Sequence, residues 1–196
     1  MLGAAVGIAV AIASSSSSKS SVATRAPDAT WADGRRPAPA FELRDQRGAP
    51  VSIRALRGKP AVVTFIDPVC RNLCPLEAAA LGKVVRDLGS NAPAVVAVSV
   101  NPWADTRANF RADARAWRLP PSWRWGTGSH ADLARVWRNY GVAVQVQTKH
   151  VAGVTVRNVI HTEGSYLIDA RGFERALFLY PFRPADVERE LEQLHS

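Results

Sequence analysis

The sequence predicts an α/β fold in which a central β-sheet is covered by helices on both faces. Two short apolar runs, residues 61–66 and 94–100, are typical of central strands, because such strands meet water on neither face. A helical pattern of apolar residues follows each run. Alternating apolar and polar residues near both ends of the chain predict antiparallel hairpins. Together these patterns indicate a mixed sheet between helical layers.

The predicted domain begins with a β-hairpin. Apolar and polar residues alternate over 41–45 and 51–53, with a turn around Gly48. The apolar strand 61–66 follows, and a helix begins near Pro75, where the missing N–H of proline costs nothing. The inward face of this helix is predicted to carry Leu81, Val84, Val85 and Leu88.

Two further helices are expected after the strand 94–100. Asp105 or Thr106 can cap the first of these helices. Its predicted inward residues are Phe110, Ala114 and Trp117. Residues 129–132 resemble a capping box and predict the start of the second helix. Its apolar face is predicted to carry Leu133, Val136, Trp137 and Tyr140.

The last third of the chain predicts two hairpins and a helix. Residues 142–159 alternate around Lys149 and Gly153, as in a hairpin or an extended insertion. Residues 165–169 and 173–180 predict a closing hairpin, and a final helix is expected from Pro184. This element order is the thioredoxin-like arrangement, with an N-terminal β-hairpin extension and an inserted hairpin before the last strands.

The first 39 residues differ from the rest of the chain. Residues 1–13 contain an apolar run and the small-x-small sequence Ala11-Ile12-Ala13, and are interpreted as a signal peptide or a truncated membrane anchor. A helix of this length would cover only about 18 Å of a ~30 Å hydrocarbon core. Residues 14–39 predict a linker rich in Ser, Pro and Ala, which leaves 40–196 as the folded domain. Export predicts an extracytoplasmic protein, secreted or membrane-anchored.

The net charge of +8 bears on the class of partner. The arginines are scattered along the chain, and no nucleic-acid-binding motif is present, so we expect no nucleic-acid partner. A basic surface that meets an acidic protein or an anionic lipid explains the charge equally well.

The only two cysteines of the chain, Cys70 and Cys74, follow the first apolar strand and precede the helix. A helix N-terminus favours thiolate, which attacks disulfides and binds soft metals. The three-residue spacing allows a redox-active pair, a shared metal or an inert disulfide. A disulfide across so short a loop would constrain the unfolded chain little, which disfavours a purely structural bridge.

A third candidate group is a histidine. Of His130, His150, His161 and His195, only His161 directly precedes the closing hairpin. In a thioredoxin-like sheet that loop packs beside the cysteine loop. We therefore expect Cys70, Cys74 and His161 to converge.

These residues carry a resemblance to the Sco/SenC family, copper-binding, thioredoxin-like proteins that serve cytochrome c oxidase assembly. The resemblance covers roughly residues 41–194. It rests on the apolar strand leading to Cys-x-x-x-Cys-Pro at 70–75, on Val-Ser-Val-Asn-Pro at 98–102, and on Tyr-Leu-Ile-Asp at 166–169 after His161. Within the family copper is held by both cysteines and this histidine, which implies Cys70, Cys74 and His161 as the ligands here.

The chain also departs from the family pattern. Relatives commonly have Pro and Asp after the first cysteine, where this chain has Arg71 and Asn72. Asn101 replaces the usual Asp of the second motif. These changes leave the three ligands intact and make the loop more basic.

The donor set itself favours copper. Two thiolates and an imidazole suit Cu(I) or a thiolate-bound Cu(II). Structural zinc usually takes four protein ligands, and the sequence holds no second cysteine pair to complete them.

The main functional hypothesis is an exported copper metallochaperone with a thioredoxin-like Sco-type domain at 40–196. It would deliver copper to the dinuclear copper centre of cytochrome c oxidase, or reduce the cysteines of that centre. The implied partners are the oxidase subunit that carries this centre and a thiol reductant or another copper chaperone. An alternative is a metal-independent thiol-disulfide oxidoreductase in which Cys70 attacks and Cys74 resolves. A structural or copper-sensing module remains a third class.

Overall fold

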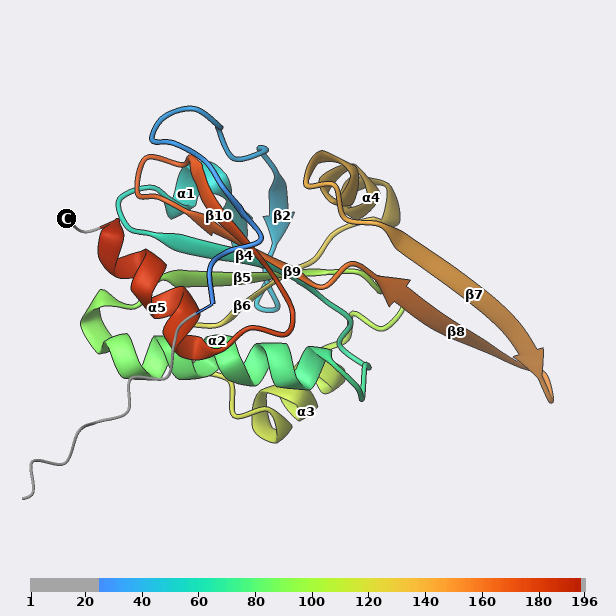
Figure 1. Cartoon of the computed structure of the whole chain (residues 1–196). Helices are drawn as coiled ribbons and strands as arrows, with labels where there is room; N and C mark the ends of the chain where they lie inside the picture. Colours follow the sequence, from blue (N-terminus) through green and yellow to red (C-terminus); the bar gives the residue numbers. More distant parts are fainter. Residues whose placement is uncertain (1–24, 195–196) are drawn as a thin grey trace, which may run out of the picture.

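The computed structural model describes residues 25–194 (Figure 1). The segment 1–13, interpreted above as a signal peptide or anchor, lies outside the described residues, as does the expected linker up to residue 24. Between residues 25 and 194, no helix combines the length and the apolar character that a membrane crossing requires.

A six-stranded mixed sheet forms the centre of the fold, in the order β1-β10-β9-β4-β5-β6. Its parallel strands are β4 (Ala61–Ile66), β5 (Ala94–Ser99) and β6 (Arg124–Gly126). Its antiparallel strands are β9 (Gly164–Ile168), β10 (Glu174–Leu179) and the edge strand β1 (Ala29–Thr30). The central position of β4 agrees with its apolar sequence, since all six of its residues are buried.

The side chains of β4 alternate between two hydrophobic cores, one on each face of the sheet. Val62 and Ile66 belong to one core, and Val63 and Phe65 belong to the other. Thr64 is also buried and hydrogen-bonds to Glu77 on the first long helix. The sheet is therefore covered on both sides, as the apolar runs predict.

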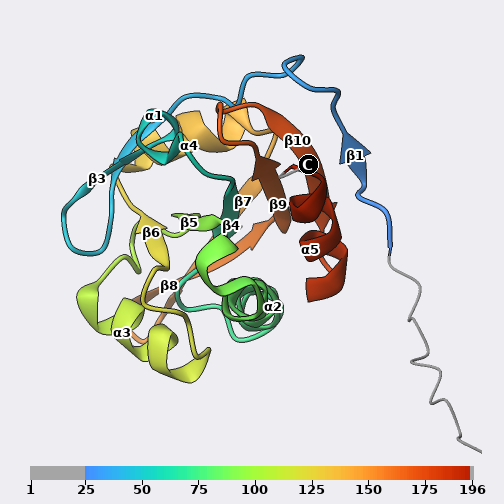
Figure 2. The same ribbon diagram turned by 90° about the vertical axis from the view of Figure 1, so that its left-hand side faces the viewer.

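Three helices cover one face of the sheet: α2 (Cys74–Leu88), α3 (Arg107–Ala116) and α5 (Pro184–Gln193) (Figure 2). A short 3-10 turn, η1 (Gly89–Asn91), follows α2. Aromatic side chains fill the space between α3 and the sheet, with the ring centroids of Phe110 and Trp125 4.8 Å apart. The buried apolar side chains of α2, including Leu81 and Val84, belong to the same core.

The opposite face is covered by α1 (Ile53–Leu56), α4 (His130–Asn139) and a hairpin of β2 (Glu42–Arg44) and β3 (Pro50–Ser52). Side chains cap both helices. Ser52 accepts a hydrogen bond from the N–H of Ala55, and Ser129 accepts one from the N–H of Asp132.

A second hairpin, β7 (Val144–Val151) and β8 (Val154–His161), extends from the body of the domain as an arm (Figure 1). Most of its side chains are exposed. The turn passes through Ala152 and Gly153, both with positive φ. The pairing of Val144 with His161 closes the base of the arm, so the arm fixes the position of His161.

The predicted hairpins, central strands and long helices are confirmed, and the α/β, thioredoxin-like class agrees with them. Of the three inward residues predicted for α3, Phe110 and Trp117 are buried, and the prediction for Ala114 was wrong. Ala114 is exposed and Asp113 is buried instead, because positions i, i+3 and i+7 from Phe110 face the sheet. The strands β1 and β6 were not predicted. β1 lies within the expected linker and pairs with β10, so this part of the segment 14–39 is docked on the sheet.

Candidate metal site

The cysteine loop connects β4 to α2 and is folded around Asp67. The Oδ1 atom of Asp67 accepts hydrogen bonds from the N–H of Val69, at 2.9 Å, and from the side-chain amide of Asn101, at 3.1 Å. The N–H of Cys70 donates to the carbonyl oxygen of Asp67 at 3.1 Å. These bonds close a tight turn that leaves Cys70 in the loop and Cys74 at the first position of α2.

The two cysteines are both free and differ in environment. Cys74 is fully buried, and Cys70 is partly exposed. A hydrogen bond from the Cys74 thiol, supported by the N–H of Asn72 at 3.5 Å, lowers the pKa of Cys70 to about 6. The same thiol-to-sulfur bond, together with burial, raises the pKa of Cys74. At neutral pH the pair therefore consists of a Cys70 thiolate and a Cys74 thiol.

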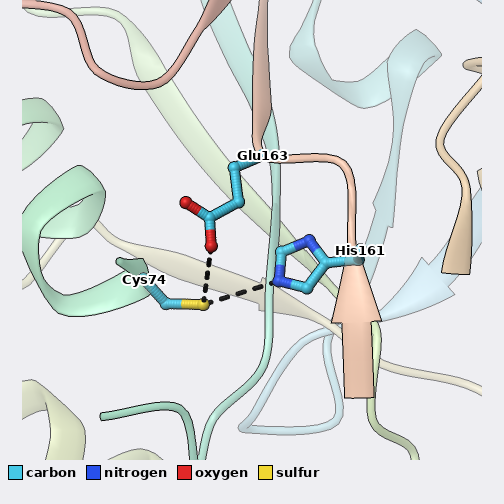
Figure 3. Close-up of side chains that lie close together, drawn as sticks. All are labelled: Cys74, His161 and Glu163. Atoms are coloured by element: carbon cyan, nitrogen blue, oxygen red, sulfur yellow. Dashed lines mark hydrogen bonds between the residues drawn. The ribbon is translucent and has the colours of Figure 1, made fainter. Parts of the chain in front are cut away.

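His161 lies at the end of β8 and faces Cys74 (Figure 3). Its Nδ1 atom is 3.1 Å from the carbonyl oxygen of Thr162, which can only accept, so Nδ1 carries the proton. Burial lowers the pKa of His161, which keeps the ring neutral. Its Nε2 atom, 3.5 Å from the sulfur of Cys74, therefore presents a free lone pair to the thiol. A backbone carbonyl that orients a histidine in this way is a common feature of metal sites.

Glu163 completes this cluster from the connection between β8 and β9. Its Oε1 atom lies 4.0 Å from the sulfur of Cys74 (Figure 3). The ligand atoms of Cys74, His161 and Glu163 all lie within 4.8 Å of one another. Burial, with smaller contributions from the charges of Glu77 and Cys70, raises the pKa of Glu163 to about 7. The cluster therefore combines a sulfur, a nitrogen and an oxygen donor.

Glu77 lies behind the cysteine pair and joins α2 to the sheet. Its Oε1 atom accepts hydrogen bonds from the hydroxyls of Thr64 on β4, at 2.8 Å, and Ser165 on β9, at 2.7 Å. Burial raises the pKa of Glu77 to about 7. Because α2 carries Cys74 and β9 follows Glu163, this carboxyl group holds together the elements that build the cluster.

The cluster opens into a surface cleft of about 540 Å³. Cys70, His161 and Glu163 line it, together with the apolar side chains of Leu73, Ile160 and Leu179. Leu73 and Ile160 are 47% and 49% exposed, which is high for large apolar residues. Cys70 is thus reachable from solvent past the apolar rim that these side chains form, whereas Cys74 is fully buried and does not line the cleft.

The structure brings together the site residues that the sequence singles out. Cys74 contacts both His161 and Cys70, whereas Cys70 lies outside the group of ligand atoms within 4.8 Å of one another. Metal binding by these residues stays a prediction. The sequence reasoning missed Glu163 as a site residue, although its position two residues after His161 was a usable signal.

The other histidines lie elsewhere or outside the described residues. His130 packs its ring against the rings of Trp103 and Trp137, with centroids 5.4 and 5.7 Å away. His150 interacts with the hydroxyl of Thr155 on the arm. His195 is outside the described residues.

Glu163 is a possible fourth ligand that the sequence did not indicate, so the expectation that zinc lacks one was wrong. Glu163 supplies an oxygen donor beside Cys74 and His161, and Cys70 is hydrogen-bonded to the Cys74 thiol. Such a set has the number of ligands that zinc takes. Ligand number therefore does not separate copper from zinc here.

Comparison with known proteins agrees with the fold. The structure of Bradyrhizobium japonicum ScoI with copper bound matches with a TM-score of 0.70 and 24% identity, over 81% of this chain and 99% of that chain. The structure of yeast Sco1 with copper bound matches with a TM-score of 0.70 and 20% identity, over 81% of this chain and 87% of that chain. The structure of BsSco matches with a TM-score of 0.66 and 19% identity, over 88% of this chain and 99% of that chain. BsSco is described as a member of the Sco family of cytochrome c oxidase assembly proteins with a disulfide switch.

Among curated proteins, none matches this chain significantly. The family model described as SCO1/SenC matches residues 31–196, which include the whole sheet apart from β1 and both sides of the cysteine–histidine cluster. The chain therefore belongs to the SCO1/SenC family.

Proposed function

We propose that this protein binds one copper ion through Cys70, Cys74 and His161. The observation that carries the proposal is the 3.5 Å contact between the Cys74 sulfur and the Nε2 atom of a neutral His161, with Cys70 hydrogen-bonded to the same thiol. Thiolate sulfur and imidazole nitrogen are donors that suit copper. The copper-bound structures of B. japonicum ScoI and yeast Sco1, which share this fold, support the choice of metal.

The three groups are prepared to different degrees for metal binding. Cys70 is already a thiolate at neutral pH, and His161 already presents a lone pair. Cys74 must lose its proton. Its thiol donates to the Cys70 thiolate, and His161 and Glu163 are further acceptors within 4.0 Å of its sulfur. Because bound metal replaces that proton, copper uptake is expected to weaken as the pH falls.

The function that follows is that of an exported copper metallochaperone. A site with an open position at a cleft can release its metal, and the apolar rim suits a transient protein contact. We place the protein outside the cytoplasm because of the apolar N-terminal run, and we take the recipient to be the oxidase subunit with the dinuclear copper centre. A thiol reductant or another copper chaperone would restore the reduced or loaded state.

A second candidate function is reduction of a disulfide between the cysteines of the oxidase's dinuclear copper centre. The lowered pKa of Cys70 beside the Cys74 thiol favours it. The Cys70 thiolate would attack the disulfide of the partner to form a mixed disulfide. Cys74 would then displace the partner's second thiol, leaving a Cys70–Cys74 disulfide and a partner reduced by two electrons. The disulfide switch described for BsSco is consistent with this chemistry.

One experiment separates the two functions. Copper-loaded protein is mixed with a purified oxidase copper domain in its dithiol form, and metal-free reduced protein is mixed with the disulfide form. Metal delivery predicts that the dinuclear copper absorption appears in the first mixture and is lost with His161→Ala. Reduction predicts new thiols in the second mixture with or without His161. Failure to load copper, or retention of copper beside the dithiol domain, would contradict delivery.

A further inference from the structure

We propose that Glu163 is a fourth ligand of the site, a carboxylate that binds Cu(II) and is not needed for Cu(I). This inference rests on the proposed copper-binding function. It adds a residue outside the Cys-x-x-x-Cys and His161 motifs of the family, and it gives the site a means of distinguishing the two oxidation states.

The position of Glu163 is set by the backbone rather than by a flexible side chain. Glu163 lies two residues after His161, in the short connection that leads into β9. Its carbonyl oxygen accepts a hydrogen bond from the N–H of Tyr180 at 3.0 Å, at the end of β10. The same connection holds the ring of His161 through Thr162. The carboxylate and the imidazole therefore reach Cys74 from one fixed segment.

The surroundings of the carboxylate lack an obvious compensating group. Its Oε1 atom contacts the Cys74 thiol, and its Oε2 atom is shielded from solvent without a hydrogen-bond partner. Within residues 25–194, no Lys or Arg forms a salt bridge with Glu163. A shielded carboxylate without a cation is costly, so a bound metal ion would satisfy it.

Glu77 provides a contrast within the same region. Glu77 is fully buried, whereas Glu163 is partly exposed. The Oε1 atom of Glu77 already accepts two hydroxyl hydrogen bonds, although its Oε2 atom has no partner, and Glu77 does not belong to the group of ligand atoms around Cys74. The carboxylate aimed at the thiol and the imidazole is that of Glu163 (Figure 3).

The chemistry of the donor set explains the preference between oxidation states. Soft thiolates select Cu(I), whereas Cu(II) favours tetragonal sites with nitrogen and oxygen ligands. Cys70, Cys74 and His161 are enough for Cu(I). The oxygen of Glu163 adds a harder, anionic donor, which stabilises Cu(II) more than Cu(I).

The test uses the full chain and Glu163→Gln, which keeps the shape of the side chain and removes its charge. Affinities for Cu(II) and Cu(I) are measured separately by chelator competition, and the Cu(II) form is examined by electron paramagnetic resonance. We expect Cu(II) affinity to fall by about 10- to 100-fold, the range seen even for groups that only support a ligand. The Cu(II) hyperfine pattern should change, and Cu(I) affinity should change less than about threefold.

One control variant isolates the ligand effect. Glu192→Gln removes the same charge from an exposed position on α5 and should keep the wild-type Cu(II) spectrum and affinity. An unchanged spectrum and Cu(II) affinity in Glu163→Gln would overturn the ligand assignment alone, as would equal losses for both oxidation states. Wild-type protein that takes up no copper would overturn the proposed function and this ligand together.

Discussion

The sulfur of Cys74 lies 3.5 Å from the Nε2 atom of His161, although 87 residues separate them in the chain. The antiparallel pairing of β4 with β9 brings the start of α2 beside the connection that follows β8. The β7–β8 arm then fixes His161 at its base. The candidate site is therefore a product of the sheet topology, and the following predictions examine how its groups work.

The first prediction concerns the reactivity of Cys70. Its rate of alkylation by iodoacetamide, followed by mass spectrometry across a range of pH, should rise with a midpoint near pH 6. Cys74→Ala removes the thiol that hydrogen-bonds to Cys70, so the midpoint should move up toward the ordinary thiol value of about 8.5. Cys74→Ser keeps a donor and should move it less. A wild-type midpoint near 8.5 would contradict the described hydrogen bond.

The second prediction concerns stability and pH. The pKa of Glu77 is raised by burial to about 7 in the folded protein, above its unfolded value. The unfolded chain thus releases this proton first as the pH rises. The contribution of protonated Glu77 to the free energy of unfolding is present in full below about pH 4.5 and is lost as the pH rises through 7. A shift of this size corresponds to about 3 kcal/mol of unfolding free energy.

Denaturant unfolding of wild type and Glu77→Gln between pH 5 and 8 checks this effect. Glutamine can still accept from Thr64 and Ser165 through its oxygen, but it does not titrate. The free energy of unfolding of Glu77→Gln should therefore fall less over this interval than that of the wild type. Parallel curves for the two proteins would show that Glu77 does not titrate as described.

The third prediction concerns the apolar rim of the cleft. Ile160 and Leu179 line the cleft and are partly exposed, so a partner that reaches the cysteines would cover them. Ile160→Ser and Leu179→Ser should slow copper transfer to the oxidase domain, by about tenfold for a loss near 1.4 kcal/mol, and leave copper affinity unchanged. Val154→Ser, at the exposed tip of the arm, is the matched control. Equal transfer rates in all three variants would exclude the rim as a docking surface.

The fold was largely predictable because its strongest patterns coincide with its most buried elements. β4 is apolar at every position except Thr64 and is wholly buried, and α2 carries its apolar residues at helical spacing. β6 escaped prediction because three residues around Trp125 carry no periodic pattern, and its pairing with β5 defines it as a strand. The burial of the Asp113 side chain was equally hard to predict, since a charged residue is rarely expected in a core.

The candidate site was predictable in its residue types and less so in its grouping. The cysteine spacing and the position of His161 before a hairpin were visible in the sequence. Glu163 was not recognised as a site residue, because the direction of a loop side chain depends on how the connection between β8 and β9 is anchored. The difference between Cys70 and Cys74 likewise depends on burial and on their mutual hydrogen bond, which follow only from the fold.

The most direct measurement is anaerobic titration of the reduced protein with copper, with the number of tightly bound equivalents determined for wild type, His161→Ala and the control His150→Ala. His150 is a matched control because it lies on the exposed arm, where it interacts with Thr155. We expect one equivalent for the wild type and for His150→Ala, and loss of tight binding and of sulfur-to-copper absorption for His161→Ala. One tightly bound equivalent with an unchanged spectrum in His161→Ala would contradict this expectation.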